Sequence, residues 1–239
     1  MNNKLDNEVL NILHKYSISI TQKKTILLLS ANNIIIQIGI LKKLQQLNKL
    51  NDIKIIIGLN ESALLACLYI IGYTLDELYN IYTKQIDIIE LFKNKNLDFN
   101  ITFHNLYKKF NKKLIVIGTS LNEKKIVSFS HETFSDMKVN IALNISTTLI
   151  PYLYNNNLYI YGNCLCKYPI HLFKNEINDL IGIYINSNDS NNISTIISYL
   201  CNDIIIIPSI LEYYNNIILV KQINETDPKV LFDYGFISI

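Results

Sequence analysis

The sequence predicts an α/β fold in which a mostly parallel, doubly wound central sheet has helices on both faces. Short continuous apolar runs, which are typical of buried parallel strands, alternate with longer segments of helical periodicity. The 239 residues include only 7 Gly and 4 Pro, and no stretch resembles a linker. We therefore expect a single domain that covers residues 1–239.

The first part of the chain alternates between strands and helices after a short amphipathic helix. Apolar residues at helical spacing predict each helix, and the isoleucine- and leucine-rich runs predict the strands. In chain order we expect a helix over 5–17, a strand over 25–29, its turn over 30–33, a helix over 36–50, a strand over 53–58 and a helix over 63–73.

The second part begins with Thr74 and Glu77, whose spacing resembles a capping box at the start of a further helix. A β-hairpin, more strands and a closing helix follow. We expect a strand over 112–121 with a hairpin partner over 126–130, a helix over 137–147, strands over 158–163 and 180–185, a helix over 193–201, a strand over 215–223 and a helix over 228–236.

Composition excludes several classes of protein. The net charge is +2, from 22 basic and 20 acidic residues, and no clustered basic face argues for nucleic-acid binding. The N-terminal segment has charges where a signal peptide needs an apolar core, and no apolar run is long enough to span a membrane. We therefore expect a cytoplasmic protein, and the heavy use of Ile, Asn, Lys and Tyr indicates an AT-rich genome such as that of some large viruses.

The cysteines give a weak signal for metal binding. Cys164 and Cys166 form a C-x-C pair, whereas Cys67 and Cys201 are distant in sequence. A structural zinc site needs a second ligand pair at suitable spacing, which the sequence lacks. We expect free thiols and neither a metal nor a cofactor.

The turn after the second predicted strand has the pattern of a nucleophile elbow. In GLNES, Gly58 and Ser62 stand where the G-x-S-x-G frame has its two glycines, and Asn60 stands at the nucleophile. Asparagine is one of the few residues besides glycine that tolerate positive φ. Asn60 therefore preserves the expected turn while removing the reactive hydroxyl.

Five segments, in order and over nearly the whole chain, resemble the patatin-like phospholipase family. They match its first strand and glycine-rich loop, its G-T-S-A-G elbow, its hairpin with an Ala-Ser-x-x-x-Pro turn, its Asp-Gly-Gly or Asp-Gly-Ala strand and its closing D-x-G-aromatic helix. The segments are TILLLSANN with IGILKKLQQLNKL, IIIGLNESALLACLYIIGYTLDEL, KKLIVIGTSL to STTLIPYL, LYIYGNCLCKYPI and FDYGF. The resemblance implies a three-layer patatin-like fold.

The resemblance also implies where a serine–aspartate dyad and an oxyanion loop would stand. The serine position holds Asn60 and the aspartate position, in the frame LYI-x-G, holds Tyr161. A phenol with a pKa of about 10 would not act as a carboxylate base at neutral pH. Residues with Cβ atoms replace the glycines of the oxyanion loop, and three further positions support the elbow. The loop positions are Ala31, Asn32 and Asn33, and the supporting positions are Gly58, Ser62 and Gly162.

Two functional hypotheses follow. The first is a catalytically inactive patatin-like protein that acts as a binding, regulatory or structural protein. Its partner would be a lipid or a protein, and the sequence leaves open whether it forms a homo-oligomer. The alternative is an active lipid acyl hydrolase with rearranged catalytic residues, in which Ser62 would act with Glu61 or His171.

Overall fold

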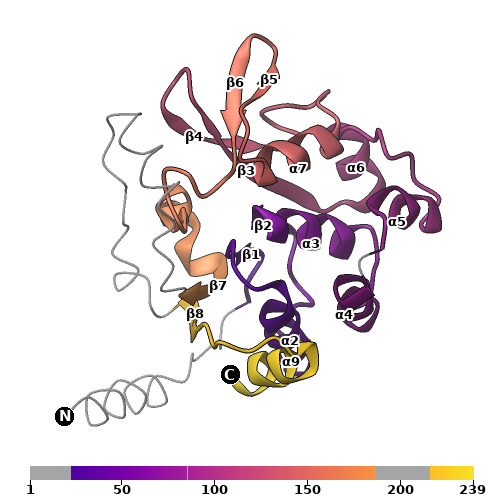
Figure 1. Ribbon diagram of the computed structural model, residues 1–239, viewed down its shortest axis with the longest axis vertical. Helices are drawn as coiled ribbons and strands as arrows, with labels where there is room; N and C mark the ends of the chain where they lie inside the picture. Colours follow the sequence, from indigo (N-terminus) through magenta and orange to yellow (C-terminus); the bar gives the residue numbers. More distant parts are fainter. Residues whose placement is uncertain (1–22, 85, 187–215) are drawn as a thin grey trace.

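The computed structural model describes residues 23–84, 86–186 and 216–239. The helices expected over 5–17 and 193–201 lie outside these residues. The described chain forms an eight-stranded mixed sheet with helical segments packed on it (Figure 1). The parallel strands are β1 (Ile26–Leu29), β2 (Ile55–Leu59), β3 (Lys113–Ser120), β7 (Leu180–Asn186) and β8 (Ile217–Lys221), and the antiparallel ones are β4 (Lys125–Phe129), β5 (Tyr152–Tyr154) and β6 (Asn157–Ile160).

The strand order is β5-β6-β3-β2-β1-β7-β8, and β4 pairs with β3. Strand β1 lies between β2 and β7, so the winding of the parallel sheet reverses at β1. In open α/β sheets, ligand sites form beyond the carboxyl ends of strands at such a reversal. The loop that follows β1 therefore borders the position where a site is expected, and the loop after the neighbouring strand β2 lies at the same edge of the sheet.

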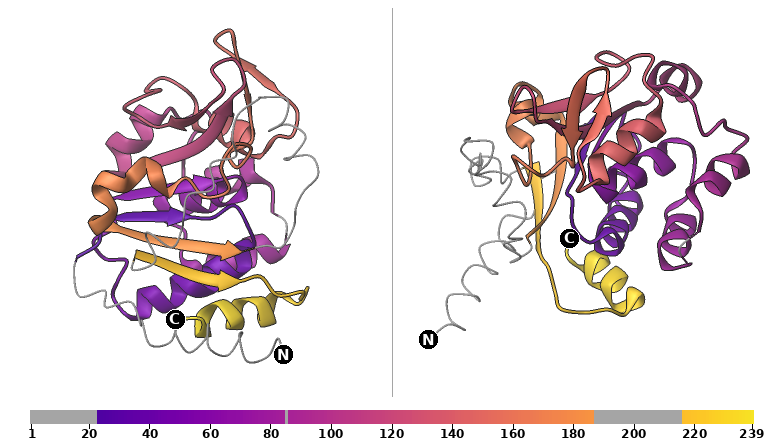
Figure 2. Two further views of the ribbon diagram at one scale, coloured as in Figure 1. Left: turned by 90° about the vertical axis from the view of Figure 1, so that its left-hand side faces the viewer. Right: turned by 45° about the horizontal axis from the view of Figure 1, so that its top comes forward.

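Helical segments cover both faces of the sheet, and the side chains of β1 alternate between the two cores. Leu27 and Leu29 of β1 face the larger core with most of the α-helices, whereas Ile26 and Leu28 face the other side with the 3₁₀ segment. The α/β fold with helical segments on both sheet faces is thus confirmed (Figure 2). The helices are α2 (Ile34–Gln46), α3 (Glu61–Ile70), α4 (Leu75–Lys84), α5 (Ile88–Asn94), α6 (Phe103–Phe110), α7 (Val139–Thr147) and α9 (Pro228–Ile237), and the 3₁₀ segment is η1 (Ile170–Asp179).

Several boundaries differ from the sequence prediction. Helix α2 begins at Ile34 because Asn33 caps it and accepts a hydrogen bond from the Ile36 N–H at 3.2 Å. It ends at Gln46, not at residue 50, and Asn48 follows with φ 57°. Strand β6 ends at Ile160, so residues 161–163 form a loop instead of a strand end. Helices α5 and α6, strand β5 and η1 were not predicted.

The capping box was predicted correctly. The Thr74 N–H donates to Glu77 Oε2 at 2.7 Å, and the Glu77 N–H donates to Thr74 Oγ1 at 3.2 Å. These bonds lower the pKa of Glu77, chiefly through the backbone bond from Thr74. Helix α4 therefore begins where the sequence placed it.

Helices α2 and α9 cross at unusually close range because each contributes a glycine. A Cβ at Gly39 would lie 2.1 Å from the Phe232 carbonyl oxygen, and one at Gly235 would lie 2.1 Å from the Ile36 carbonyl oxygen. Both neighbours are backbone atoms that cannot rotate away. The C-terminal helix is thus held against α2, the helix that follows the β1 loop.

We predict that Gly39→Ala lowers the free energy of unfolding by about 1–3 kcal/mol, because the added methyl group forces the helices apart. Urea denaturation measures this change. At an uncrowded position inside a helix the same substitution raises stability by roughly 0.5–1 kcal/mol. A stabilised Gly39→Ala protein would therefore contradict the close crossing.

Candidate functional site

The turn between β2 and α3 has the backbone conformation of a strained elbow. Asn60 has φ 52° and ψ −128°, a region that residues with a Cβ rarely adopt. A Cβ at Gly58 would lie 2.4 Å from the Ala63 Cα, so glycine permits the helix to fold back directly over the strand. The chain thus directs the half-buried Asn60 side chain out of the turn, beyond the carboxyl end of β2.

Two neighbouring segments hold Asn60. Its N–H donates to the buried Ser146 Oγ at 2.9 Å, and that hydroxyl donates to the Ile117 carbonyl of β3 at 2.7 Å. Its side chain forms a reciprocal pair with Asn163: Asn60 Nδ2 donates to Asn163 Oδ1 at 3.0 Å, and the Asn163 N–H donates to Asn60 Oδ1 at 3.2 Å. We call these bonds the amide clasp.

The loop after β6 brings Asn163, and not Tyr161, to the elbow. The Gly162 N–H donates to the Ser146 carbonyl at 3.1 Å, and a Cβ at Gly162 would lie 2.4 Å from the Ile117 carbonyl oxygen. The buried Tyr161 ring packs in a small cluster with Ile160 and Cys164. Burial, and then Cys164, raise the pKa of Tyr161 to about 12, so the phenol keeps its proton at neutral pH.

Sequence reasoning missed Asn163. The resemblance aligns position 161 with the family aspartate and position 163 with a small glycine or alanine. The available signal was a polar side chain at a position where the family has a small one. The dyad assignment of Tyr161 stays a prediction, and the structure adds Asn163 as the residue bonded to Asn60.

The loop between β1 and α2 is short and tied to its own helix. The fully buried Gln37 donates from Nε2 to the Ser30 carbonyl at 3.0 Å and to the Asn32 carbonyl at 2.7 Å. Asn32 Nδ2 donates to the Ile185 carbonyl at 3.2 Å, and Asn33 caps α2 with φ 40°. Ala31 is half-buried and packs against the smaller core. The predicted oxyanion positions therefore lie in a loop that caps a helix and binds the end of β7.

The surroundings of Ser62 indicate a structural role for its hydroxyl. Its side chain is fully buried, and its hydroxyl donates to the Leu59 carbonyl at 2.8 Å and accepts from the Leu59 N–H at 2.9 Å. Glu61 is exposed, and His171 is half-buried, with a pKa lowered by burial and by Lys174. The Ser62 hydroxyl thus joins the end of β2 to the first turn of α3.

Cys67, Cys164 and Cys166 are buried, and none of them forms a disulfide within the described residues. Burial raises the pKa of Cys67 to about 12 and that of Cys166 to about 11, so both thiols stay protonated and unreactive. Within residues 23–84, 86–186 and 216–239, no group of His, Cys, Asp and Glu side chains could hold a metal ion. Cys201 lies outside these residues.

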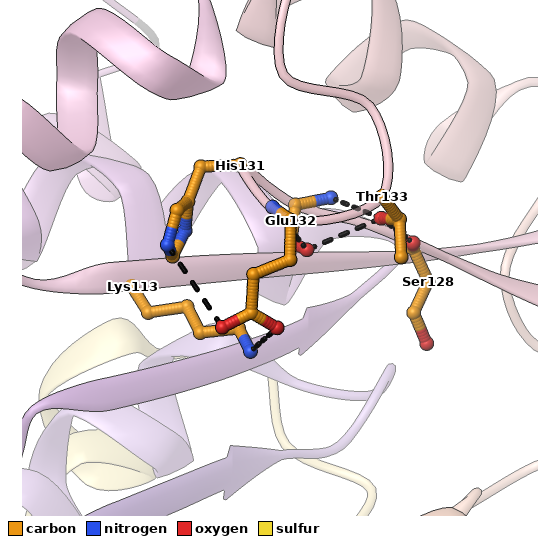
Figure 3. A network of polar contacts seen from close by, with 6 residues as sticks. Lys113, Ser128, His131, Glu132 and Thr133 are labelled. Carbon is orange, nitrogen blue, oxygen red and sulfur yellow. Dashed lines mark hydrogen bonds and ion pairs between the residues drawn. The ribbon is translucent and has the colours of Figure 1, made fainter.

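A second polar cluster lies in the turn after β4 (Figure 3). Glu132 forms an ion pair with Lys113 at the start of β3, and His131 Nε2 lies 3.9 Å from Glu132 Oε1. The His131 ring stacks on Tyr107 of α6, with ring centroids 3.8 Å apart. Thr133 Oγ1 donates to the Ser128 carbonyl at 2.6 Å. These contacts join α6 to β3 and β4, which indicates a structural role.

No protein-family model matches the chain. A protein of Acanthamoeba polyphaga mimivirus described as uncharacterized, R571, is 26% identical over 180 residues, which cover 61% of this chain and 59% of that protein. The "Probable lipid hydrolase 463L" of Invertebrate iridescent virus 6 is 27% identical over 157 residues, 52% of this chain and 54% of that protein. The chain therefore spans less than two thirds of the length of these viral relatives.

Two solved structures are similar to the chain in fold. VipD from Legionella pneumophila superposes with a TM-score of 0.61 at 12% identity, over 90% of this chain and 66% of VipD. The type III effector ExoU superposes with a TM-score of 0.50 at 13% identity, over 90% of this chain and 52% of ExoU.

The sheet order and the turn after β2 define an α/β protein with a strained strand–turn–helix elbow at the carboxyl edge of its parallel sheet. More particularly, the chain has the patatin-like fold, and the family resemblance predicted from its motifs is confirmed at the level of the fold. Across the described residues, none of the helices combines the length and the apolar character needed to cross a membrane.

We predict that Ser146→Ala lowers the free energy of unfolding by about 1–3 kcal/mol, because it leaves the Asn60 N–H and the Ile117 carbonyl without their partner. The matched control is Thr147→Ala at the exposed neighbouring position, which should change stability by less than about 0.5 kcal/mol. Equal urea midpoints for both variants would argue against a supporting role for Ser146.

We also predict that His131 makes stability depend on pH. Burial is the main cause that lowers its pKa, with Lys113 and His104 acting in the same direction and Glu132 opposing them. Because the folded pKa lies below the unfolded value of about 6.5, this contribution is complete above that pH and is lost as the pH falls below it.

His131→Phe keeps the stacked ring and removes the titration. Urea denaturation between about pH 7 and pH 5 should show a smaller loss of stability for this variant than for the wild type. An unchanged slope in His131→Phe would refute the assignment.

Proposed function

We propose that this protein is a catalytically inactive patatin-like protein that acts through binding, as a regulatory or structural component. The amide clasp between Asn60 and Asn163 carries the proposal. At the elbow, where acyl hydrolysis needs a hydroxyl and a proton acceptor, the neutral carboxamide of Asn60 is bonded to the side chain and the backbone N–H of Asn163.

The chemistry of these groups supports the proposal. The nitrogen lone pair of a carboxamide is delocalised into its carbonyl, so Asn60 is a poor nucleophile. Asn163 carries no charge and cannot take a proton at neutral pH, and the raised pKa of Tyr161 makes that phenol unsuitable as a base. Each step of covalent acyl transfer therefore lacks a group to perform it.

The alternative of an active hydrolase with rearranged residues receives no support at Ser62. A nucleophilic hydroxyl must be accessible and free to transfer its proton to a base. The Ser62 hydroxyl is fully buried and bonded twice to the backbone of Leu59. Moving it toward a substrate would break the junction between β2 and α3.

The partner of the inactive protein is proposed to be a lipid or another protein. A viral relative carries the description of a probable lipid hydrolase, which favours lipid as the ligand class. A homo-oligomer and a cytoplasmic location stay predictions.

A fluorophosphonate probe with intact-mass detection tests the proposal, because the probe adds covalently to activated serines. We predict an unchanged mass for the wild-type protein. One adduct on a single serine, lost when that serine is changed to alanine, would overturn the proposal.

The matched positive control is the double variant Asn60→Ser with Asn163→Asp, which places a hydroxyl and a carboxylate on the two positions of the clasp. We expect it to react with the probe more than either single variant. Asn60→Ser with Tyr161→Asp should gain less, because position 161 faces Cys164 and Ile160. Equal reactivity of the two double variants would argue against Asn163 as the residue opposite the elbow.

A further inference from the structure

The hairpin formed by β5 and β6, together with the segment that leads into it, exposes a group of apolar side chains. The exposed fractions are 59% for Leu149, 77% for Ile150, 65% for Leu153 and 38% for Leu158. Leu153 and Leu158 are cross-strand partners, so their side chains share one face of the hairpin. The hairpin projects from one end of the molecule (Figure 1). We call these four residues the hairpin patch.

We propose that the hairpin patch docks this protein on the surface of a phospholipid bilayer. Exposed aliphatic side chains that project together are characteristic of interaction sites and not of ordinary solvated surface. Four further observations favour a bilayer over a protein as the occupant.

The first observation is the absence of charge. Residues 139–166 contain no Asp, Glu, Lys, Arg or His, although charged residues make up 18% of the whole chain. This segment contains the entire hairpin and the approach to it. A charged side chain is costly to bring into the apolar part of a bilayer, and here none has to be moved.

The second observation is the pair of tyrosines beside the patch. Tyr152 and Tyr154 flank Leu153 in β5 and pack partly against the main core, where both stay half-exposed. Tyrosine rings favour the headgroup region of a membrane because they combine an apolar ring with a polar hydroxyl. Because side chains alternate along β5, both rings lie on the hairpin face opposite Leu153, where they would border the docked surface.

The third observation is a positive turn next to the hairpin. Leu158 is bonded to the β3–β4 turn, because its N–H donates to Asn122 Oδ1 at 2.7 Å and its carbonyl accepts from the Leu121 N–H at 2.9 Å. The same turn carries Lys124 and one acidic residue, Glu123, and leads into Lys125 at the start of β4. Both lysines are exposed, and Glu123 is 2.7 Å from Lys125. The turn is therefore net positive, which complements anionic headgroups.

The fourth observation is the short edge of the sheet. Strand β5 has only three residues, Tyr152–Tyr154, and offers few backbone groups to a protein strand that might pair with it. Docking on an apolar lipid surface requires no pairing of backbone groups. This property favours lipid over a second copy of the chain.

The patch lies close along the chain to the loop that holds Asn163. The face that bears Leu158 continues to Ile160, and Tyr161 and Cys164 extend it to the loop that holds Asn163. Strand β6 therefore connects the patch to the loop that holds the amide clasp. The inference names a partner for the binding role proposed above and rests on that role, but it requires no chemistry at Asn60.

Vesicle flotation provides the first test. The full chain is mixed with vesicles of phosphatidylcholine and phosphatidylserine, and the bound fraction is measured. We expect the wild type to float with the vesicles and Ile150→Asp to bind about tenfold more weakly, as for the loss of one buried aliphatic side chain. The matched control is Ile237→Asp, because Ile237 is 72% exposed but lies in α9. Wild-type binding by Ile150→Asp would overturn the proposal.

A tryptophan reporter detects contact with lipid directly and does not rely on a variant that loses binding. The chain contains no Trp, so the emission comes from the introduced residue alone. In Leu153→Trp, vesicles should shift the emission to the blue, and brominated lipids should quench it. Ile237→Trp should show neither effect. Equal responses at both positions, or none at position 153, would contradict docking through the hairpin.

The remaining outcomes also discriminate. Light scattering that shows a dimer in the wild type and a monomer in Leu153→Asp would assign the patch to a second copy of the chain and refute the lipid proposal. Failure of vesicle binding with no fluorophosphonate adduct would reject this inference and leave the proposed inactivity intact. Vesicle binding together with an adduct would support this inference and reject the proposed inactivity.

Discussion

The site depends on one constraint, the positive-φ backbone at Asn60. That conformation is costly for a residue with a Cβ, so the surrounding structure must hold it. Ser146 binds the Asn60 N–H and Asn163 binds its side chain, while Gly58 and Gly162 allow the neighbouring backbones to approach. The turn thus joins β2, α7 and the loop after β6 at the carboxyl end of β2.

The same contacts explain how an elbow can persist without a nucleophile. In an active hydrolase the strain at this turn presents a hydroxyl to the substrate. Here the Asn60 side chain is bonded to the side chain and to the backbone N–H of Asn163, which gives the turn a structural role. The fold therefore has a reason to keep the turn that is independent of catalysis.

The sequence predicted the central strands and α2, α3 and α7 because continuous isoleucine and leucine runs and helical periodicity are strong local signals. It missed α5 and α6, which are short and begin at side-chain caps formed by Asp87 and Thr102. In the sequence, such short segments resemble turns. Their helical conformation is supported by packing against the main core, whose other residues are distant in sequence.

Only part of the site could be predicted from the sequence, and the reason is physical. Asn60 could be found because the elbow is a contiguous motif that requires a positive-φ residue at its centre. Asn163 could not be found by counting along the family motif, because the close approach of Gly162 to Ile117 decides which side chain of the loop turns toward Asn60.

The central claim is that the elbow performs no acyl hydrolysis, and turnover of phospholipid vesicles by the wild type and by Asn60→Ala tests it most directly. Fatty-acid release should equal the buffer background for both proteins. Release above background by the wild type that Asn60→Ala abolishes would contradict the account, because it would make this turn a catalytic site.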